Sequence, residues 1–181
     1  MKGIVFREFY NMVEDVFSDD MMDQLIEATN PKSGGSYTTV GTYDYNELVN
    51  MVVELSKRTN TPVNDLIFSF GKHLASVFTE KYSDFFKSAP NTIEFLKTID
   101  NHIHVEVKKL YPDAELPKFS FDDSNPNCLT LRYQSSRPFG VLAQGLIEGC
   151  SDYYHERLNI EMLDQSDDQA SNVEFVISKA A

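Results

Sequence analysis

The chain has 181 residues, of which 41% are hydrophobic and 24% are charged, so it can bury a sizeable core and is not a disordered tail. Its formal net charge of −12 argues against a protein whose main role is to hold nucleic-acid phosphates. No apolar run of about 18 residues could span a membrane, and two cysteines are too few for a disulfide framework. We therefore expect one domain of a reduced cytoplasmic protein, without a nucleic-acid or membrane partner.

Apolar residues at helical spacing predict a series of helices in the first part of the chain. Residues 30–36, with the sequence Asn-Pro-Lys-Ser-Gly-Gly-Ser, form the clearest loop between them. The expected helices cover residues 4–17, 19–28, 44–57, 62–78 and 91–111. The last of them carries an apolar stripe made of Ile93, Leu96, Ile99, Ile103, Val107 and Leu110.

Beyond Pro112 the pattern changes to short alternating runs that are typical of strands. Turn-forming residues at 122–127 predict a hairpin between the first two runs, and residues 140–157 read as one more helix. Three glycines in that helix predict the close approach of a bulky group. The expected strands are residues 118–121, 128–134, 158–163 and 173–179. We therefore expect an α+β fold, with a mostly helical N-terminal lobe and a C-terminal lobe that combines a small antiparallel sheet with helices.

Two histidines lie on the expected helix 91–111. On a helical wheel His102 points away from the apolar stripe, whereas His104 lies at its edge. A neutral imidazole that projects from a helix beside an apolar surface suits a single axial ligand of a buried metal centre. A packed, hydrogen-bonded histidine is the commoner reason for such a position, so this signal is weak by itself.

A second set of polar residues continues one face of the expected strand 128–134. Tyr133, Ser135 and Arg137 alternate along the chain, so their side chains project together. A phenol, a hydroxyl and a guanidinium suit carboxylates, because arginine offers a bidentate fork and the others add neutral donors. The alternative is an edge strand whose arginine is paired with an acid. Together with His104, this clamp predicts a flat apolar cofactor with two acid tails, which describes haem.

Five short segments carry a specific resemblance to a known family. They are Met1-Lys2-Gly3, Ile103-His104-Val105-Glu106-Val107, Leu116-Pro117, the Tyr-x-Ser-x-Arg signature at 133–137, and Gly145-Leu146-Ile147-Glu148-Gly149. With these segments in this order, the whole chain resembles the H-NOX (haem nitric oxide/oxygen binding) family, whose relatives include the haem domain of soluble guanylate cyclase. The resemblance implies a single domain over residues 1–181, with a helical distal lobe (1–60), an α+β haem-ligating lobe (61–181) and haem between them.

The resemblance also implies roles for individual residues. It implies haem b (iron protoporphyrin IX) as the cofactor and His104 as the axial ligand of its iron. It further implies that Tyr133, Ser135 and Arg137 bind the haem propionates. Pro117 matches a proline that packs against the macrocycle and helps to distort it. From the residues alone, an ordinary turn proline after a helix explains Pro117 as well.

Family position places six apolar residues on the distal side of the haem: Val5, Phe9, Leu74, Phe78, Leu142 and Leu146. Members that bind oxygen stably carry a distal tyrosine where this chain has Leu142. Bound oxygen carries partial negative charge that a hydrogen-bond donor stabilises, whereas NO and CO need no such donor. The resemblance therefore implies a sensor that binds NO and CO at ferrous haem and excludes oxygen. If these residues simply fill a core, they still leave no donor over the iron.

The resemblance implies a signalling role and no enzymatic activity of the chain itself. NO binding would weaken the bond to His104, release distortion held against Pro117 and let the two lobes relax. The expected partner is a sensor histidine kinase, or a cyclic-di-GMP synthase or phosphodiesterase. Alternatives are an oxygen-binding haem sensor and a haem-free interaction module that uses the acidic surface. A hydrolase built on Ser135 is disfavoured, because the sequence has no Gly-x-Ser-x-Gly elbow.

Overall fold

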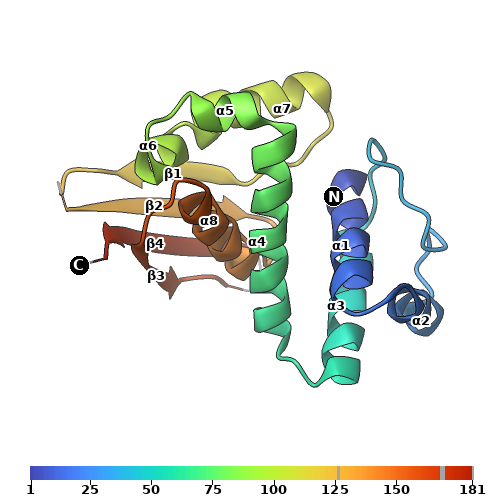
Figure 1. Cartoon of the computed structure of the whole chain (residues 1–181). Coiled ribbons are helices and arrows are strands. Elements are labelled where there is room, and N and C mark those ends of the chain that lie inside the picture. Colours follow the sequence, from blue (N-terminus) through green and yellow to red (C-terminus); the bar gives the residue numbers. More distant parts are fainter. Residues whose placement is uncertain (126, 168–169, 181) are drawn as a thin grey trace.

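The computed structural model of the chain describes residues 1–125, 127–167 and 170–180, and its architecture is α+β (Figure 1). The helices are α1 (Gly3–Val16), α2 (Asp19–Thr29), α3 (Tyr45–Thr59), α4 (Val63–Lys81), α5 (Ser83–Lys87), α6 (Thr92–Lys97), the π-helix η1 (Ile99–Ile103), α7 (His104–Leu110) and α8 (Gly140–Tyr153). The strands are β1 (Lys118–Asp122), β2 (Cys128–Ser135), β3 (Leu158–Asp164) and β4 (Ser171–Lys179). The predicted fold class is confirmed.

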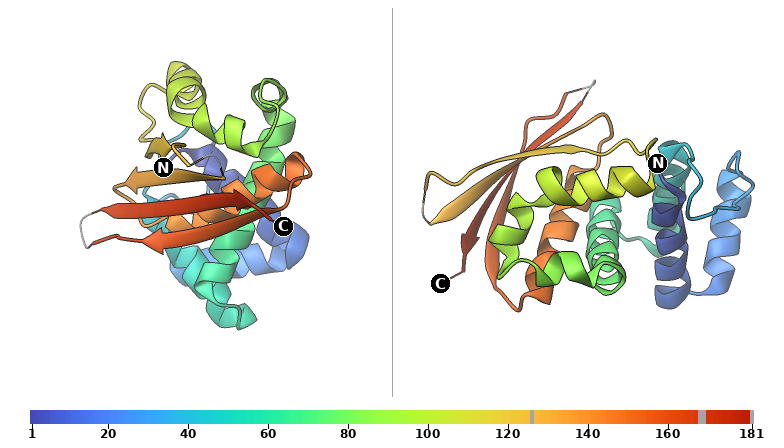
Figure 2. Two further views of the ribbon diagram at one scale, coloured as in Figure 1. Left: turned by 90° about the vertical axis from the view of Figure 1, so that its left-hand side faces the viewer. Right: turned by 90° about the horizontal axis from the view of Figure 1, so that it is seen from above.

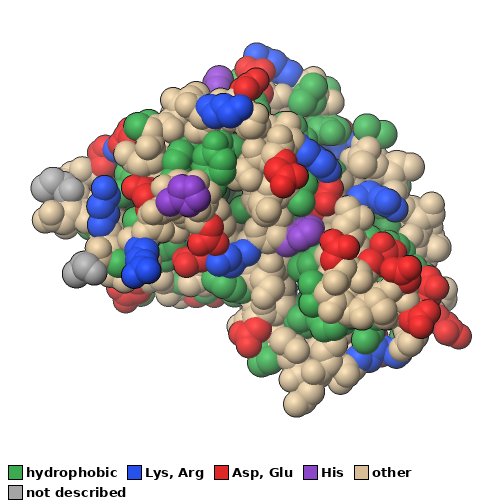
Figure 3. All heavy atoms as spheres, in the orientation of Figure 1, with side chains coloured by type: hydrophobic (Ala, Val, Ile, Leu, Met, Phe, Trp, Pro, Cys, Tyr) green, Lys and Arg blue, Asp and Glu red, His purple; other side chains and the backbone are tan. Residues whose placement is uncertain are grey.

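Side-chain caps fix where several helices begin. Ser18 accepts a hydrogen bond from the backbone N–H of Met21 and starts α2. Asp44 caps α3 through Asn46, and Asn91 caps α6 through the N–H of Glu94. Asp19 and Asp20 occupy the first turn of α2, where their charge is favourable beside the helix N-terminus. Acidic side chains gather around this end of the molecule (Figure 3), so helix-terminal positions explain part of the acidic surface.

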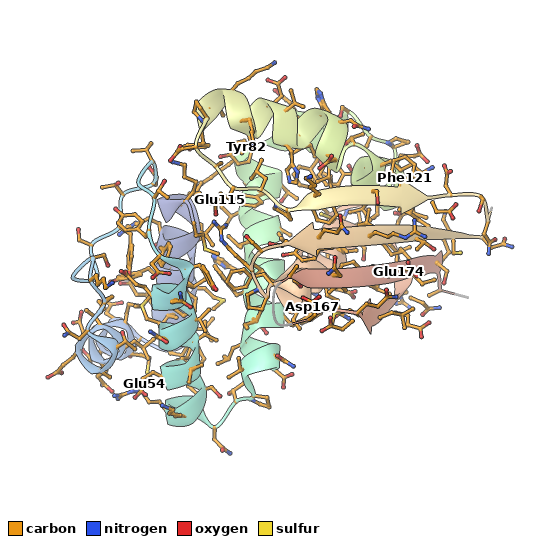
Figure 4. All side chains as sticks on the ribbon, turned by 180° about the vertical axis from the view of Figure 1, so that it is seen from behind. Glu54, Tyr82, Glu115, Phe121, Asp167 and Glu174 are labelled. Carbon is orange, nitrogen blue, oxygen red and sulfur yellow. The ribbon has the colours of Figure 1, made fainter. Side chains whose placement is uncertain are left out.

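The four strands form one antiparallel sheet in the order β1-β2-β4-β3. Side chains on one face of β2, among them Leu129, Leu131 and Tyr133, are buried against helices. Figure 2 shows α4–α8 on that side and α1–α3 beyond α4, at the far end from the sheet. Figure 4, seen from behind, shows the other face of the sheet without a covering helix. Both expected strand pairs are confirmed, although Pro126 in the expected turn lies outside the described residues.

Two apolar clusters form the interior of the protein. The first core joins α1–α3 to α4 and the start of α8 through buried residues that include Phe6, Phe9, Leu25, Met51, Phe70, Leu74 and Leu142. The second core lies between the sheet and α5, α6 and α8, and includes Phe86, Phe95, Leu96, Leu131, Ile147 and Phe175. Phe78 packs against both cores. The lobe boundary expected after residue 60 falls between α3 and α4, and α4 supplies side chains to the first core beyond it.

Glycines let α4 and α8 approach each other closely. A Cβ atom at Gly71 would lie 2.4 Å from the carbonyl oxygen of Leu142, and one at Gly145 would lie 2.2 Å from that of Phe68. A Cβ at Gly149 would meet Ala75 at 2.4 Å. The bulky group predicted from the glycines is therefore α4. At this distance the two helices can pack only where α8 carries glycine. None of the helices in the described part of the chain has the length and apolar character that crossing a membrane requires.

The prediction of one continuous α-helix over residues 91–111 is wrong. The segment is divided into α6, η1 and α7, and the N–H of His104 bonds to the carbonyl of Ile99, five residues back. A tertiary contact explains the break, because the carboxylate of Asp100 accepts the N–H of Phe119 from β1 at 3.2 Å. The structure also has a short α5 that the sequence did not predict, and α8 ends at Tyr153 instead of residue 157.

Candidate functional site

His104 is the first residue of α7, directly after the π-helical turn, and its side chain is 17% exposed. Its Nδ1 lies 3.4 Å from Oδ1 of Asp100, the oxygen that also accepts the N–H of Phe119. Burial lowers the pKa of His104, and the hydrogen bond to Asp100 only partly opposes that effect. The imidazole is therefore neutral at pH 7, and among the described residues no hydrogen bond uses its Nε2. A neutral ring oriented through Nδ1 is the form in which histidine binds a metal.

The helical segment that carries His104 is loosely packed. No residue of η1 or α7 is fully buried, although the segment contains Ile99, Ile103 and Val107. Leu110 was expected to face inward, but it is 67% exposed, so that prediction is wrong. The extra residue in the π-turn rotates α7 relative to α6, and therefore one apolar stripe does not run through both helices. A surface pocket of about 280 Å³ lies beside η1 and β1 and is lined by Leu96, Lys97, Asp100, Asn101, Phe119, Ser120, Phe121 and Leu131.

The phenol of the expected clamp lies on a strand inside the sheet. Tyr133 is 4% exposed and pairs with Phe119 of β1 and Val173 of β4. The edge-strand part of the alternative is wrong, because β2 has a neighbour on each side, whereas its other part, an acid paired with Arg137, is observed. Burial raises the pKa of Tyr133, so its hydroxyl stays protonated and can donate a hydrogen bond. Ser135 ends the strand, and its Oγ accepts the backbone N–H of Arg137 at 3.1 Å.

Arg137 follows β2 and is already engaged with a carboxylate. Its Nη2 donates to the side chain of Glu115, and its Nη1 donates to the Glu115 carbonyl oxygen at 3.2 Å. The guanidinium also lies over the ring of Tyr45, 5.8 Å from the ring centroid. The Arg137 side chain is only 14% exposed, whereas that of Glu115 is 73% exposed. Figure 4 shows Glu115 at the junction between α1 and the sheet-bearing part of the molecule.

Sequence reasoning missed Glu115, because no spacing links it to Arg137, 22 residues later. It expected an acid beside Arg137 only as an alternative to the clamp. The observed pair shows that the largely buried guanidinium donates hydrogen bonds to a carboxylate. Pro117 lies in the same loop, is half-buried and directly precedes β1.

The six expected distal residues meet in the first core. Phe9, Leu74 and Leu142 are buried there, at 0%, 2% and 8% exposure. Val5, Phe78 and Leu146 are partly buried against the same cluster. The Phe9 ring contacts Phe70 edge-on, with ring centroids 5.4 Å apart. A wholly apolar cavity of about 20 Å³ adjoins this group between Phe70 and Leu142.

These features fit haem. His104 offers a neutral imidazole nitrogen, and Arg137 already holds a carboxylate. The apolar side chains of η1 and α7 lack a packing partner that would bury them fully, as expected beside a large apolar cofactor. Tyr133, Ser135 and Arg137 follow one another at the end of β2, so their donors are available to neighbouring acid groups.

Comparisons with known proteins agree with this chemistry. A family model described as Haem-NO-binding matches residues 2–162. The unliganded Fe(II) H-NOX protein from K. algicida is 36% identical, with a TM-score of 0.92 and coverage of 100% of this chain and 97% of that one. No curated protein matches the chain.

Two further solved structures represent liganded H-NOX proteins. The IWP-051-bound H-NOX from Shewanella woodyi, in the Fe(II)CO state, is 40% identical with a TM-score of 0.84, covering 99% of this chain and 95% of that one. An H-NOX protein from S. oneidensis in the Fe(II)NO state is 26% identical with a TM-score of 0.89, and both chains are covered completely. This chain therefore belongs to the Haem-NO-binding (H-NOX) family, whose domains bind haem and serve as haem-based gas sensors instead of catalysts.

Proposed function

We propose that this protein is an NO sensor that binds NO and CO at ferrous haem, excludes oxygen and signals to a separate enzyme. His104 supplies the imidazole for the iron, and Tyr133, Ser135 and Arg137 hold the propionates. Pro117 packs against the macrocycle. The haem, when bound, supplies the ferrous iron at which diatomic gases bind.

The apolar character of the distal residues carries this proposal. Phe9, Leu74 and Leu142 are buried in one cluster and offer no N–H or O–H group from their side chains. Oxygen bound to ferrous haem requires a donor to stabilise its partial negative charge, whereas NO does not. A pocket of this composition therefore favours NO and CO over oxygen.

Tyr10 and Tyr37 of the first core are candidate substitute donors, and both hydroxyls already donate to other groups. Tyr10 donates to the carbonyl oxygen of Gly35 at 2.6 Å, and Tyr37 donates to Glu47 at 2.8 Å. Moving one of these hydroxyls to a gas ligand would break a formed hydrogen bond and leave its partner unsatisfied. This arrangement disfavours the oxygen-sensor alternative.

The proposed signalling step depends on a difference in packing between β2 and the helical segment that carries His104. The propionate-binding residues lie on or directly after a central strand, whereas His104 lies on a segment without fully buried residues. A change at His104 on ligand binding would therefore move α7 more readily than β2 and would alter how residues 1–60 meet residues 61–181. The partner that reads this change is a sensor histidine kinase or a cyclic-di-GMP synthase or phosphodiesterase. A ligand shifts such an equilibrium only by its preference for one state.

Absorption spectra of the ferrous protein under nitrogen, in air and with NO test the proposal. We expect the Soret band to shift with NO and CO, and the spectrum in air to match that under nitrogen until the iron oxidises. A stable spectral change specific to oxygen would establish the oxygen-sensor alternative. A haem-loaded protein that does not respond to NO would contradict the proposal outright.

Leu142→Tyr, with Leu142→Phe as its control, tests the distal side directly. Both variants introduce a ring of nearly the same size, and only tyrosine adds a donor. We expect tyrosine alone to make the ferrous spectrum sensitive to oxygen. If phenylalanine has the same effect, then pocket volume and not hydrogen bonding controls oxygen binding.

A further inference from the structure

Asp113, which lies between α7 and β1, forms close contacts with the N-terminal lobe, defined here as residues 1–60. Its Oδ1 lies 2.7 Å from Nζ of Lys2, and its Oδ2 accepts a second contact from Nζ at 2.9 Å. The hydroxyl of Thr42 donates to the same Oδ2 at 2.8 Å. A single carboxylate of the haem-ligating part is therefore held by an ammonium and a hydroxyl from the N-terminal lobe.

On the N-terminal side of this contact, several hydrogen bonds fix the positions of Lys2 and Thr42. Lys2 and Thr42 form a β-bridge, and the N–H of Gly3 donates to the carbonyl of Gly41 at 2.8 Å. A Cβ at Gly3 would lie 1.8 Å from the Thr38 carbonyl oxygen, so only glycine permits this approach. Nζ of Lys2 also donates to Thr42 Oγ1 at 2.9 Å, and the Lys2 side chain is only 13% exposed. Lys2 is therefore a fixed cation at the first turn of α1.

Asp113 lies close to the end of α7, so this contact links the helix of His104 to the N-terminal lobe. Asp113 follows Leu110, the last residue of α7, by three residues, and Nζ of Lys2 also lies 5.4 Å from the ring centroid of Tyr111. Figures 1 and 2 agree in placing the end of α7 beside the N-terminus. Because no residue of α7 is fully buried, its ends control its position more than its packing does. One end begins at His104, and the other leads to Asp113.

We propose that Asp113, Lys2 and Thr42 form a coupling clamp that ties α7, and through it His104, to the N-terminal lobe. This inference rests on the proposed gas-sensing function, because the clamp transmits a displacement of the His104 helix to α1. Asp113 acts as a positioning residue and does not touch the haem. An ordinary exposed ion pair contributes little to stability, so the role of the clamp is to link two movable parts.

Amide hydrogen exchange of the haem-loaded ferrous protein, without and with NO, tests the clamp. In the wild type we expect NO to change exchange both in residues 104–110 and in residues 1–8. In Asp113→Asn the response of residues 104–110 remains, while that of residues 1–8 becomes roughly fivefold smaller. Lys2→Gln breaks the ion pair from its other side and should give the same loss. Thr42→Val, which keeps the ion pair, should give a smaller loss.

Asp152→Asn is the matched control. Asp152 pairs with Lys72 at 2.8 Å and has a 57% exposed side chain, against 61% for Asp113, but both residues of this pair lie in residues 61–181. It should leave the response of residues 1–8 unchanged. An unaltered response of residues 1–8 in Asp113→Asn, or no such response in the wild type, would overturn the clamp. A protein whose Soret band ignores NO instead refutes the sensing function, and the same samples report it.

Discussion

The strand β2 and the segment η1–α7 both carry residues of the proposed haem site, but the two are packed very differently in the fold. β2 is paired on both sides, and Leu129, Leu131 and Tyr133 on its inner face are 4% exposed or less. In η1 and α7 no residue is fully buried, and a surface pocket of about 280 Å³ lies beside η1 and β1. For the proposed site, this contrast predicts rigid binding of the haem propionates beside β2 and a more mobile ligand of the iron on α7.

Removing the proposed iron ligand on α7 has the largest expected effect. His104→Gly deletes the imidazole, so we expect loss of haem or a haem that needs added imidazole to recover its ferrous spectrum. His102→Ala is the control, since His102 is exposed and packs only edge-on against Phe85. Absorption spectra with and without imidazole measure both variants. An unchanged ferrous spectrum in His104→Gly would assign the ligand to another residue.

Weakening the proposed propionate-binding group has the second largest expected effect. Arg137→Ala removes the charge-assisted hydrogen bonds that we propose for the propionates, so we expect haem affinity to fall roughly 10- to 100-fold. Arg132→Ala provides a matched control, because Arg132 lies on the same strand but pairs with Glu174 at 3.1 Å on the exposed face. Transfer of haem to a competing apoprotein measures both affinities. Equal losses in the two variants would contradict a specific role for Arg137.

The difference in packing also predicts different costs in stability. Leu131→Ala creates a cavity at a fully buried position of β2, and we expect it to lower the free energy of unfolding by about 2–5 kcal/mol. Val107→Ala removes two methyl groups from half-buried surface of α7 and should cost about 1 kcal/mol or less. Urea denaturation followed by circular dichroism compares the two variants. Similar costs would show that α7 is packed as firmly as the sheet.

The smallest expected effect concerns pH. Hydrogen bonds from Lys2 and Thr42 lower the pKa of Asp113 from 3.8 to about 2. A lowered carboxyl pKa stabilises the folded state fully above the ordinary value, and this contribution is lost as the pH falls from near 4 toward 2. The difference in urea midpoint between wild type and Asp113→Asn should therefore be constant above about pH 5 and shrink below pH 4. A difference that persists unchanged at pH 2 would contradict the role of the charge.

Part of the site could be predicted from local periodicity, and the distal residues from the resemblance to the family. Alternation along a strand put Tyr133, Ser135 and Arg137 together, and the structure places Tyr133 on the buried face of β2 with the other two at its end. The six apolar residues expected on the distal side meet in the first core. Their roles toward haem and gas remain predictions that the variants above test.

The break in the helix of His104 could not be predicted, because its cause lies elsewhere in the chain. A wheel assumes that hydrogen bonds run four residues back, whereas the carboxylate of Asp100 is bonded to the N–H of Phe119, 19 residues later. The exposure of Leu110 follows from the same break.

The sequence by itself determined the α+β class, since helix and strand periodicity depend on residue types at fixed spacing, and its short segments carried the resemblance to the family. Tertiary structure alone decided that Glu115 holds Arg137 and that Lys2 and Thr42 hold Asp113. Each of these contacts joins segments 22 to 111 residues apart, and no periodic pattern connects them. Hydrogen bonds and ion pairs depend on distance in space, and only the folded chain sets that distance.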